Sequence, residues 1–183
     1  MYGANGSEWQ VFDWNKTTAI GMYDGKAEYN YGELQCVAHK HGARILDWNQ
    51  ASAAFGKLGF GRRDPAFLGN ATAVGIYAEY MANYVSTAGI DGIILDIETG
   101  NTSPPALLKA LRAGNTALTC ALKKALVAKV PGAVLTWAMP ARVTAADAYD
   151  YKAIMDCGAD YLTPMACETD TDTPSRFLDL RAR

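Results

Sequence analysis

The chain has 183 residues, half of them hydrophobic and a fifth charged, with a formal net charge of -2. This composition is typical of one globular domain with enough apolar material for a core, and it argues against nucleic acid or an anionic membrane as a partner. No apolar run approaches the roughly 20 residues of a membrane helix, and residues 1–10 show no signal-peptide pattern. We therefore expect a single domain over residues 1–183.

Apolar patterning predicts short strands that alternate with longer helices. In the helices, apolar residues recur at intervals of three and four, as from Phe67 to Val85 and from Leu107 to Leu126, which gives each helix one buried side. Residues 10–14 are a further candidate strand. In chain order we predict strands over 16–24, 43–49, 90–99, 133–140 and 159–166, and helices over 31–42, 64–87, 104–130 and 144–158.

The alternation of strand and helix, without a hairpin signal, predicts parallel strands joined by crossover helices. An open doubly wound sheet and a (β/α)8 barrel both fit this pattern. The first strand–helix junctions lack a glycine-rich phosphate loop, and several strands end in acids or aromatics, as barrel strands do in enzymes. Because a complete barrel needs eight strands and about 250 residues, we predict an α/β fold that forms part of a TIM barrel. The residues at the strand ends include Tyr23, Asp47, Trp48, Trp137 and Met165.

The stretch DGIILDIETG, residues 91–100, places two acids in an apolar strand. Because side chains alternate faces along a strand, Asp96 and Glu98 share one face with Ile94, and the opposite face is wholly apolar. In a barrel the acidic face points into the lumen, with the two carboxylates about 6–7 Å apart. A carboxylic acid that stays protonated beside another acid can serve as a general acid. The alternative is that both acids only cap the end of the strand.

The residues DGIILDIE resemble the DGxDxDxE signature of glycoside hydrolase family 18, the chitinases. The surroundings are similar to the di-N-acetylchitobiase branch of that family. The resemblance covers residues 9–168. Besides the signature, it rests on the stretches FDWNKTTAIGMYD, ELQCVAHKHGARIL, LTWAMPA and CGADYLTPMACE.

The resemblance implies a (β/α)8 barrel that cleaves β-1,4-linked N-acetylglucosamine with retention, using the substrate's own acetamide as nucleophile. Glu98 then matches the general acid, and Asp96 matches the residue that orients the acetamide. The expected ligand is a chitooligosaccharide or the chitobiose core of an N-glycan, bound by a monomer without a metal or other cofactor. The remaining candidate substrate contacts are Asp91, Tyr23, Asp47, Trp48, Trp137, Met165, Cys167 and Glu168.

On this resemblance the predicted strands correspond to the second to sixth of the eight barrel strands, so residues 1–183 are expected to form an incomplete catalytic domain. Two positions depart from the family pattern. Ile94 stands where the chitobiase branch has asparagine, and Cys167 replaces the tyrosine that grips the acetamide oxygen. A thiol is a weak hydrogen-bond donor. An impaired relative that binds N-acetylglucosamine sugars therefore remains an alternative function.

The cysteines are spaced too widely for CxxC motifs, so they predict either buried free thiols or one or two disulfides. N-x-S/T sequons mark glycosylation sites only if the chain enters the secretory pathway. The resemblance implies a lysosomal or secreted location. The cysteines are Cys36, Cys120, Cys157 and Cys167, and the sequons begin at Asn5, Asn15, Asn70 and Asn101.

Overall fold

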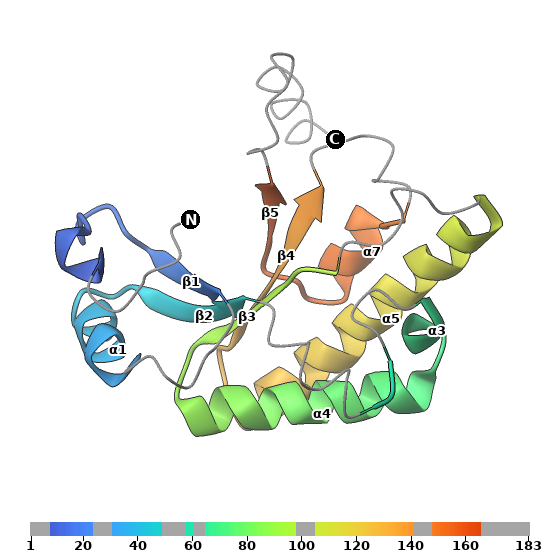
Figure 1. The fold of residues 1–183 in the computed structure, drawn as a ribbon, viewed down its shortest axis with the longest axis horizontal. Helices are drawn as coiled ribbons and strands as arrows, with labels where there is room; N and C mark the ends of the chain where they lie inside the picture. Colours follow the sequence, from blue (N-terminus) through green and yellow to red (C-terminus); the bar gives the residue numbers. More distant parts are fainter. Residues whose placement is uncertain are drawn as a thin grey trace, which may run out of the picture.

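A computed structural model describes residues 8–23, 31–48, 58–60, 65–97, 105–140 and 148–165. The strands form one curled, parallel sheet in sequential order, and the helices pack on one of its sides (Figure 1). This arrangement confirms the predicted partial barrel, because each strand follows its neighbour through a crossover. The five strands are β1 (Ala19–Tyr23), β2 (Arg44–Trp48), β3 (Gly92–Leu95), β4 (Val134–Pro140) and β5 (Tyr161–Met165).

Two long helices, α4 (Ala71–Ala88) and α5 (Pro105–Lys129), lie side by side beneath the sheet, and the contact between them is the most extensive one between two helices (Figure 1). The large buried side chains Trp137, Tyr77 and Phe67 belong to the core between sheet and helices. Gly114 allows α5 to approach α3 closely, since a Cβ there would lie 2.6 Å from Leu68 Cβ. The helices are α1 (Tyr31–Lys40), α3 (Pro65–Leu68), α4 (Ala71–Ala88), α5 (Pro105–Lys129) and α7 (Tyr151–Asp156).

Several predicted elements differ from the structure. The strand predicted over 90–99 is shorter, because β3 ends at Leu95 and residues 96 and 97 lie beyond it. The helix predicted over 64–87 is two helices, because Asn70 interrupts it and accepts a backbone N–H of the α4 first turn at 3.0 Å. The candidate strand at 10–14 is wrong, and the 3-10 helix η1 (Glu8–Val11) lies there instead. Of the helix predicted over 144–158, residues 144–147 lie outside the described part of the chain, and the described helix begins at Tyr151, where the Asp150 side chain accepts the backbone N–H of Ala153 at 2.9 Å.

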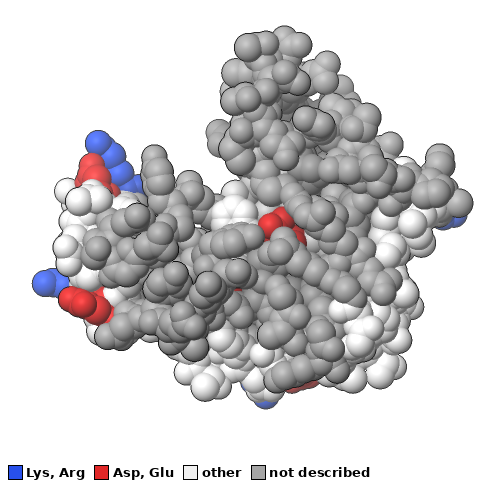
Figure 2. Space-filling model, viewed as in Figure 1, with Lys and Arg blue, Asp and Glu red and all other residues white. Residues whose placement is uncertain are grey.

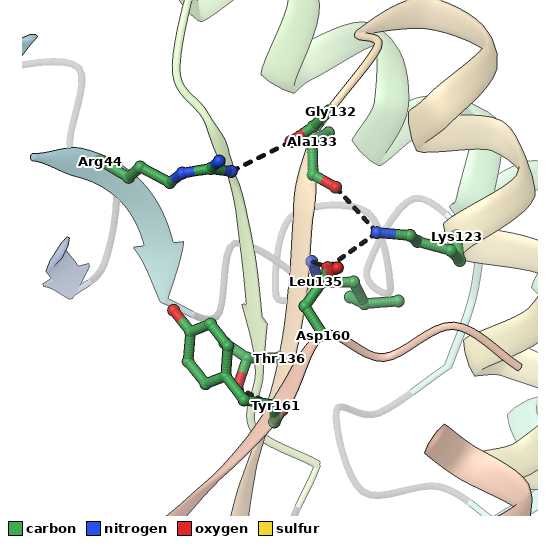
Figure 3. Close-up of polar contacts among 8 residues, drawn as sticks. All are labelled: Arg44, Lys123, Gly132, Ala133, Leu135, Thr136, Asp160 and Tyr161. Carbon is green, nitrogen blue, oxygen red and sulfur yellow. Dashed lines mark hydrogen bonds and ion pairs between the residues drawn. The ribbon is translucent and has the colours of Figure 1, made fainter. Parts of the chain in front are cut away.

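A repeated carboxylate contact fixes the strands at their N-terminal ends. Asp160 directly precedes β5. Its backbone N donates to Leu135 O of β4, and its Oδ2 accepts from Leu135 N and from Lys123 Nζ, each at 2.7 Å (Figure 3). Asp91, directly before β3, repeats this arrangement on β2. Its backbone N donates to Ile45 O, and its Oδ2 accepts from Ile45 N at 2.8 Å and contacts His39 Nε2 at 2.7 Å. Both carboxylates thus bind the neighbouring strand in register.

Replacing Asp160 with alanine is expected to lower the free energy of unfolding by about 2 kcal/mol, because a part-buried backbone N–H loses a charged acceptor. Asp91→Ala should cost a similar amount. Urea unfolding measures both. The matched control is Asp156→Ala, which removes an exposed pair with Lys152 and should change stability by less than about 0.5 kcal/mol. Equal effects at Asp160 and Asp156 would contradict the structural role.

The described cysteines comprise one disulfide pair and one free thiol. Cys120 on α5 and Cys157 at the end of α7 form a disulfide, with their Cα atoms 4.6 Å apart. Cys36 is a free thiol, and it is exposed rather than buried. Cys167 lies outside the described residues. The disulfide joins two helices that follow different strands, so it ties together successive units of the partial barrel.

Candidate active site

The two faces of the sheet carry different sets of side chains. One face packs on the helices through a large core that includes Ile93, Leu95 and Ile97. On the opposite face, which we call the lumen face, the apolar cluster formed by the described residues comes from the strands alone. The predicted alternation is therefore confirmed from Ile93 to Leu95 of β3, and Ile97 just beyond the strand continues it. The lumen cluster consists of Leu46, Ile94, Val134 and Ala138, with Ala19 and Trp48 packed against it.

Asp96 lies just beyond the C-terminal end of β3, two residues after Ile94 of the lumen cluster. Only 6% of its surface is exposed. Its Oδ2 accepts a hydrogen bond of 3.0 Å from the indole Nε1 of Trp48, the last residue of β2. The register pairs Trp48 with Ile94, so the indole extends past Ile94 to reach the carboxylate. Two of the predicted site residues are thus in direct contact.

Several predicted site residues lie outside the described part of the chain. Glu98, Cys167 and Glu168 are among them. Tyr23 and Met165 end β1 and β5, but only their backbones are described. The prediction that Glu98 shares the lumen face with Asp96 therefore remains a prediction from strand alternation.

Asp47 and Trp137 lie on the helix side of the sheet, away from Asp96. Asp47 is fully buried, and its Oδ2 accepts a hydrogen bond of 2.7 Å from Tyr84 Oη on α4. Burial raises the pKa of Tyr77, and the negative charge of Asp47 raises it further. Trp137 is also fully buried and donates from Nε1 to Thr119 Oγ1 on α5 at 2.9 Å. The side chains of Asp47 and Trp137 thus both bind helix residues on the side of the sheet opposite the lumen cluster.

Asp91 lies at the opposite end of β3 from Asp96. Its carboxylate accepts a hydrogen bond from the backbone N–H of Ile45 and contacts His39 Nε2, so its role in the structure is to hold neighbouring strands together. Packing requires glycine at the next residue, Gly92. A Cβ on Gly92 would lie 2.0 Å from the carbonyl oxygen of Val134 in β4. The first two residues of the signature thus serve strand pairing.

Sequence reasoning missed Tyr149, which is buried and donates from Oη to the carbonyl of Ile97 at 2.6 Å. Its ring also meets the edge of Trp137, with centroids 5.7 Å apart. Tyr149 therefore holds the backbone carbonyl of Ile97, the residue directly before Glu98 in the sequence. The two residues are 52 positions apart, and no local spacing could have indicated the contact.

The lumen face also carries hydroxyl groups on β4 and β5. Thr136 Oγ1 donates to the carbonyl of Tyr161 at 2.8 Å and lies 3.1 Å from Thr163 Oγ1 (Figure 3 shows the first contact). Tyr161 is partly exposed; burial raises the pKa of its hydroxyl, and the charge of Arg44 lowers it. Thr136 is fully buried and its hydroxyl is used within the sheet, so these contacts tie β4 to β5.

Within the described ranges, no three His, Cys, Asp or Glu side chains are grouped so that they could hold a metal ion. In the same part of the chain, no helix has the length and apolar character to cross a membrane. Figure 2 shows acidic and basic atoms next to each other at the rim of one face, and acidic atoms near its centre. Among the described residues, Asp96 is the buried acid that lies beside the lumen cluster.

No family model and no curated protein matches the sequence. Solved structures do match. The N-acetylglucosaminidase of glycoside hydrolase family 18 from Paenibacillus barengoltzii superposes with a TM-score of 0.62 at 16% identity, over 84% of this chain and 48% of that one. A chitinase from Bacteroides thetaiotaomicron gives a TM-score of 0.59 at 15% identity, over 88% and 49%.

A third match is catalytic domain 2 of the Ostrinia furnacalis Group II chitinase, solved as a mutant in complex with penta-N-acetylchitooctaose. Its TM-score is 0.57 at 18% identity, over 78% of this chain and 41% of that one. The chain has the fold of these glycosidases. It spans less than half the length of each of the three, which agrees with five strands of an eight-stranded barrel.

Proposed function

We propose that the chain belongs to a glycoside hydrolase that cleaves β-1,4-linked N-acetylglucosamine in chitooligosaccharides or in the chitobiose core of N-glycans. The observation that carries the proposal is the buried Asp96 on the lumen face, at the C-terminal end of β3. Active sites of barrel enzymes lie at this end of the strands. The fold shared with chitinases, one of them solved with a chitooligosaccharide, supports the same substrate class.

In the proposed reaction the acetamide of the substrate is the nucleophile, so the protein needs no nucleophile of its own. Glu98 donates a proton to the glycosidic oxygen as the bond breaks. Asp96 holds the acetamide N–H and stabilises the positive charge that develops on the nitrogen as the acetamide oxygen attacks. Trp48 and Tyr149 support this pair, one through the Asp96 carboxylate and the other through the backbone before Glu98.

A sugar-binding protein with weak or no catalysis is the second candidate. It is favoured by Ile94, which lies in the apolar lumen cluster beside Asp96 and offers no hydrogen bond. A lysosomal or secreted location, proposed from the resemblance, fits the Cys120–Cys157 disulfide, because disulfides persist in oxidising compartments.

The test of the enzyme proposal is release of a chromogenic leaving group from a chitobioside. Glu98→Gln is expected to lower kcat/KM at least about a hundredfold, because the amide cannot donate the proton. Glu79→Gln, an exposed change on α4, is the matched control and should leave the rate unchanged. Equal rates for wild type and Glu98→Gln would exclude the enzyme. Oligosaccharide binding without hydrolysis would favour the second candidate.

A further inference from the structure

Asp96 receives a hydrogen bond from the neighbouring strand rather than from its own. Along β3, the residue before it on the lumen face is Ile94, which has no donor. Trp48, the register partner of Ile94 at the end of β2, supplies a donor instead, with its Nε1 3.0 Å from Asp96 Oδ2. The indole N–H is a donor only, so its role in this contact is unambiguous.

The indole is well placed to hold the carboxylate. Its ring packs against the apolar lumen cluster, and this packing holds the ring and its N–H in place. Tryptophan has two side-chain torsions, and little conformational freedom is lost when it is fixed. Asp96 is itself almost fully buried, so its orientation is set by the side chains around it more than by bulk water.

We propose that Trp48 is a positioning residue, which holds the Asp96 carboxylate in the orientation needed to receive the acetamide of the substrate. The inference rests on the proposed function. It changes the expected role of Trp48 from a substrate contact to a residue that orients an acid. It also explains how Asp96 is oriented although its strand carries isoleucine at position 94.

The central test is Trp48→Phe, which keeps an aromatic ring and removes the N–H. We expect kcat for a chitobioside to fall about tenfold to a hundredfold, since small misplacement of a reacting group is costly, while KM changes less than about twofold. In an Asp96→Ala background the same change should cause no further loss. Trp14→Phe, on a ring that stacks on His41, is the matched control and should leave kcat unchanged.

A second readout is independent of activity. The indole N–H resonance of Trp48 is assigned by its disappearance in Trp48→Phe, and it should move upfield in Asp96→Ala. A resonance that does not move, or a Trp48→Phe variant with wild-type kcat, would overturn the positioning role. If the wild type neither cleaves nor binds chitooligosaccharides while the resonance moves, the proposed function fails and the contact belongs to the fold alone.

Discussion

Replacing Gly92 with alanine is expected to prevent the sheet from forming as it does in the wild type. The added Cβ would lie 2.0 Å from Val134 O and within 2.9 Å of Val134 C and N. Gly92 and Val134 are register partners in β3 and β4, so the colliding atoms are backbone atoms of a paired strand and cannot rotate away. Overpacking of side chains costs about 1–3 kcal/mol. Here we expect more than about 4 kcal/mol, a large part of the roughly 5–15 kcal/mol that holds a domain together.

Urea unfolding and the yield of folded protein measure this effect. The matched control is Gly75→Ala on α4, where an added Cβ meets nothing within 4 Å. That change should leave the fold intact and stabilise it by up to about 1 kcal/mol, because alanine is the better helix former. A Gly92→Ala variant with wild-type stability would show that β3 and β4 can separate without cost.

Removing the Cys120–Cys157 disulfide is expected to lower the free energy of unfolding by about 3–4 kcal/mol. The bond closes a loop of 37 residues, and opening it returns conformational entropy to the unfolded chain. The loop contains β4 and the whole of α7, a helix of 6 residues that has little stability of its own. The measurement is urea unfolding of the Cys120→Ser/Cys157→Ser variant beside the wild type.

Reductant provides a second check on the same bond. Dithiothreitol should destabilise the wild type and leave the double serine variant unchanged. Cys36→Ser is the matched control, because Cys36 is an exposed free thiol on α1 and its loss should change stability by less than about 0.5 kcal/mol. Wild-type stability that is indifferent to reductant would contradict the disulfide.

The helices and the partial barrel could be predicted because they follow from local periodicity. Leu111, Leu118, Leu122 and Leu126 recur at helical spacing, and all four are buried. The boundaries were less predictable. Asn70 begins α4 by capping it, although the apolar stripe from Phe67 onward continues through that position. A cap is a contact between one side chain and one backbone N–H, and periodicity does not contain it.

The side of the sheet on which Asp96 lies could be predicted, because the alternating row of Ile93, Leu95 and Ile97 is wholly apolar and packs on the helices. The matching prediction for Glu98 stays a prediction. In β2 each row carries one charged residue, Arg44 in one and Asp47 in the other, and in β4 both rows are largely apolar. The sequence therefore could not say whether Asp47 or Trp48 faces the lumen, nor on which side Trp137 lies. The structure turns Asp47 and Trp137 to the helices and Trp48 to the lumen.

The sequence by itself determined the order of strands and helices and the alternation along each strand, because both are properties of the local backbone. Only the tertiary structure decided which row of β2 faces Asp96 and which donor reaches it. Trp48 and Asp96 are 48 residues apart, and their contact depends on the register of β2 against β3. Register is set by pairing and packing across the sheet, so the partner of Asp96 became visible only when the strands were placed side by side.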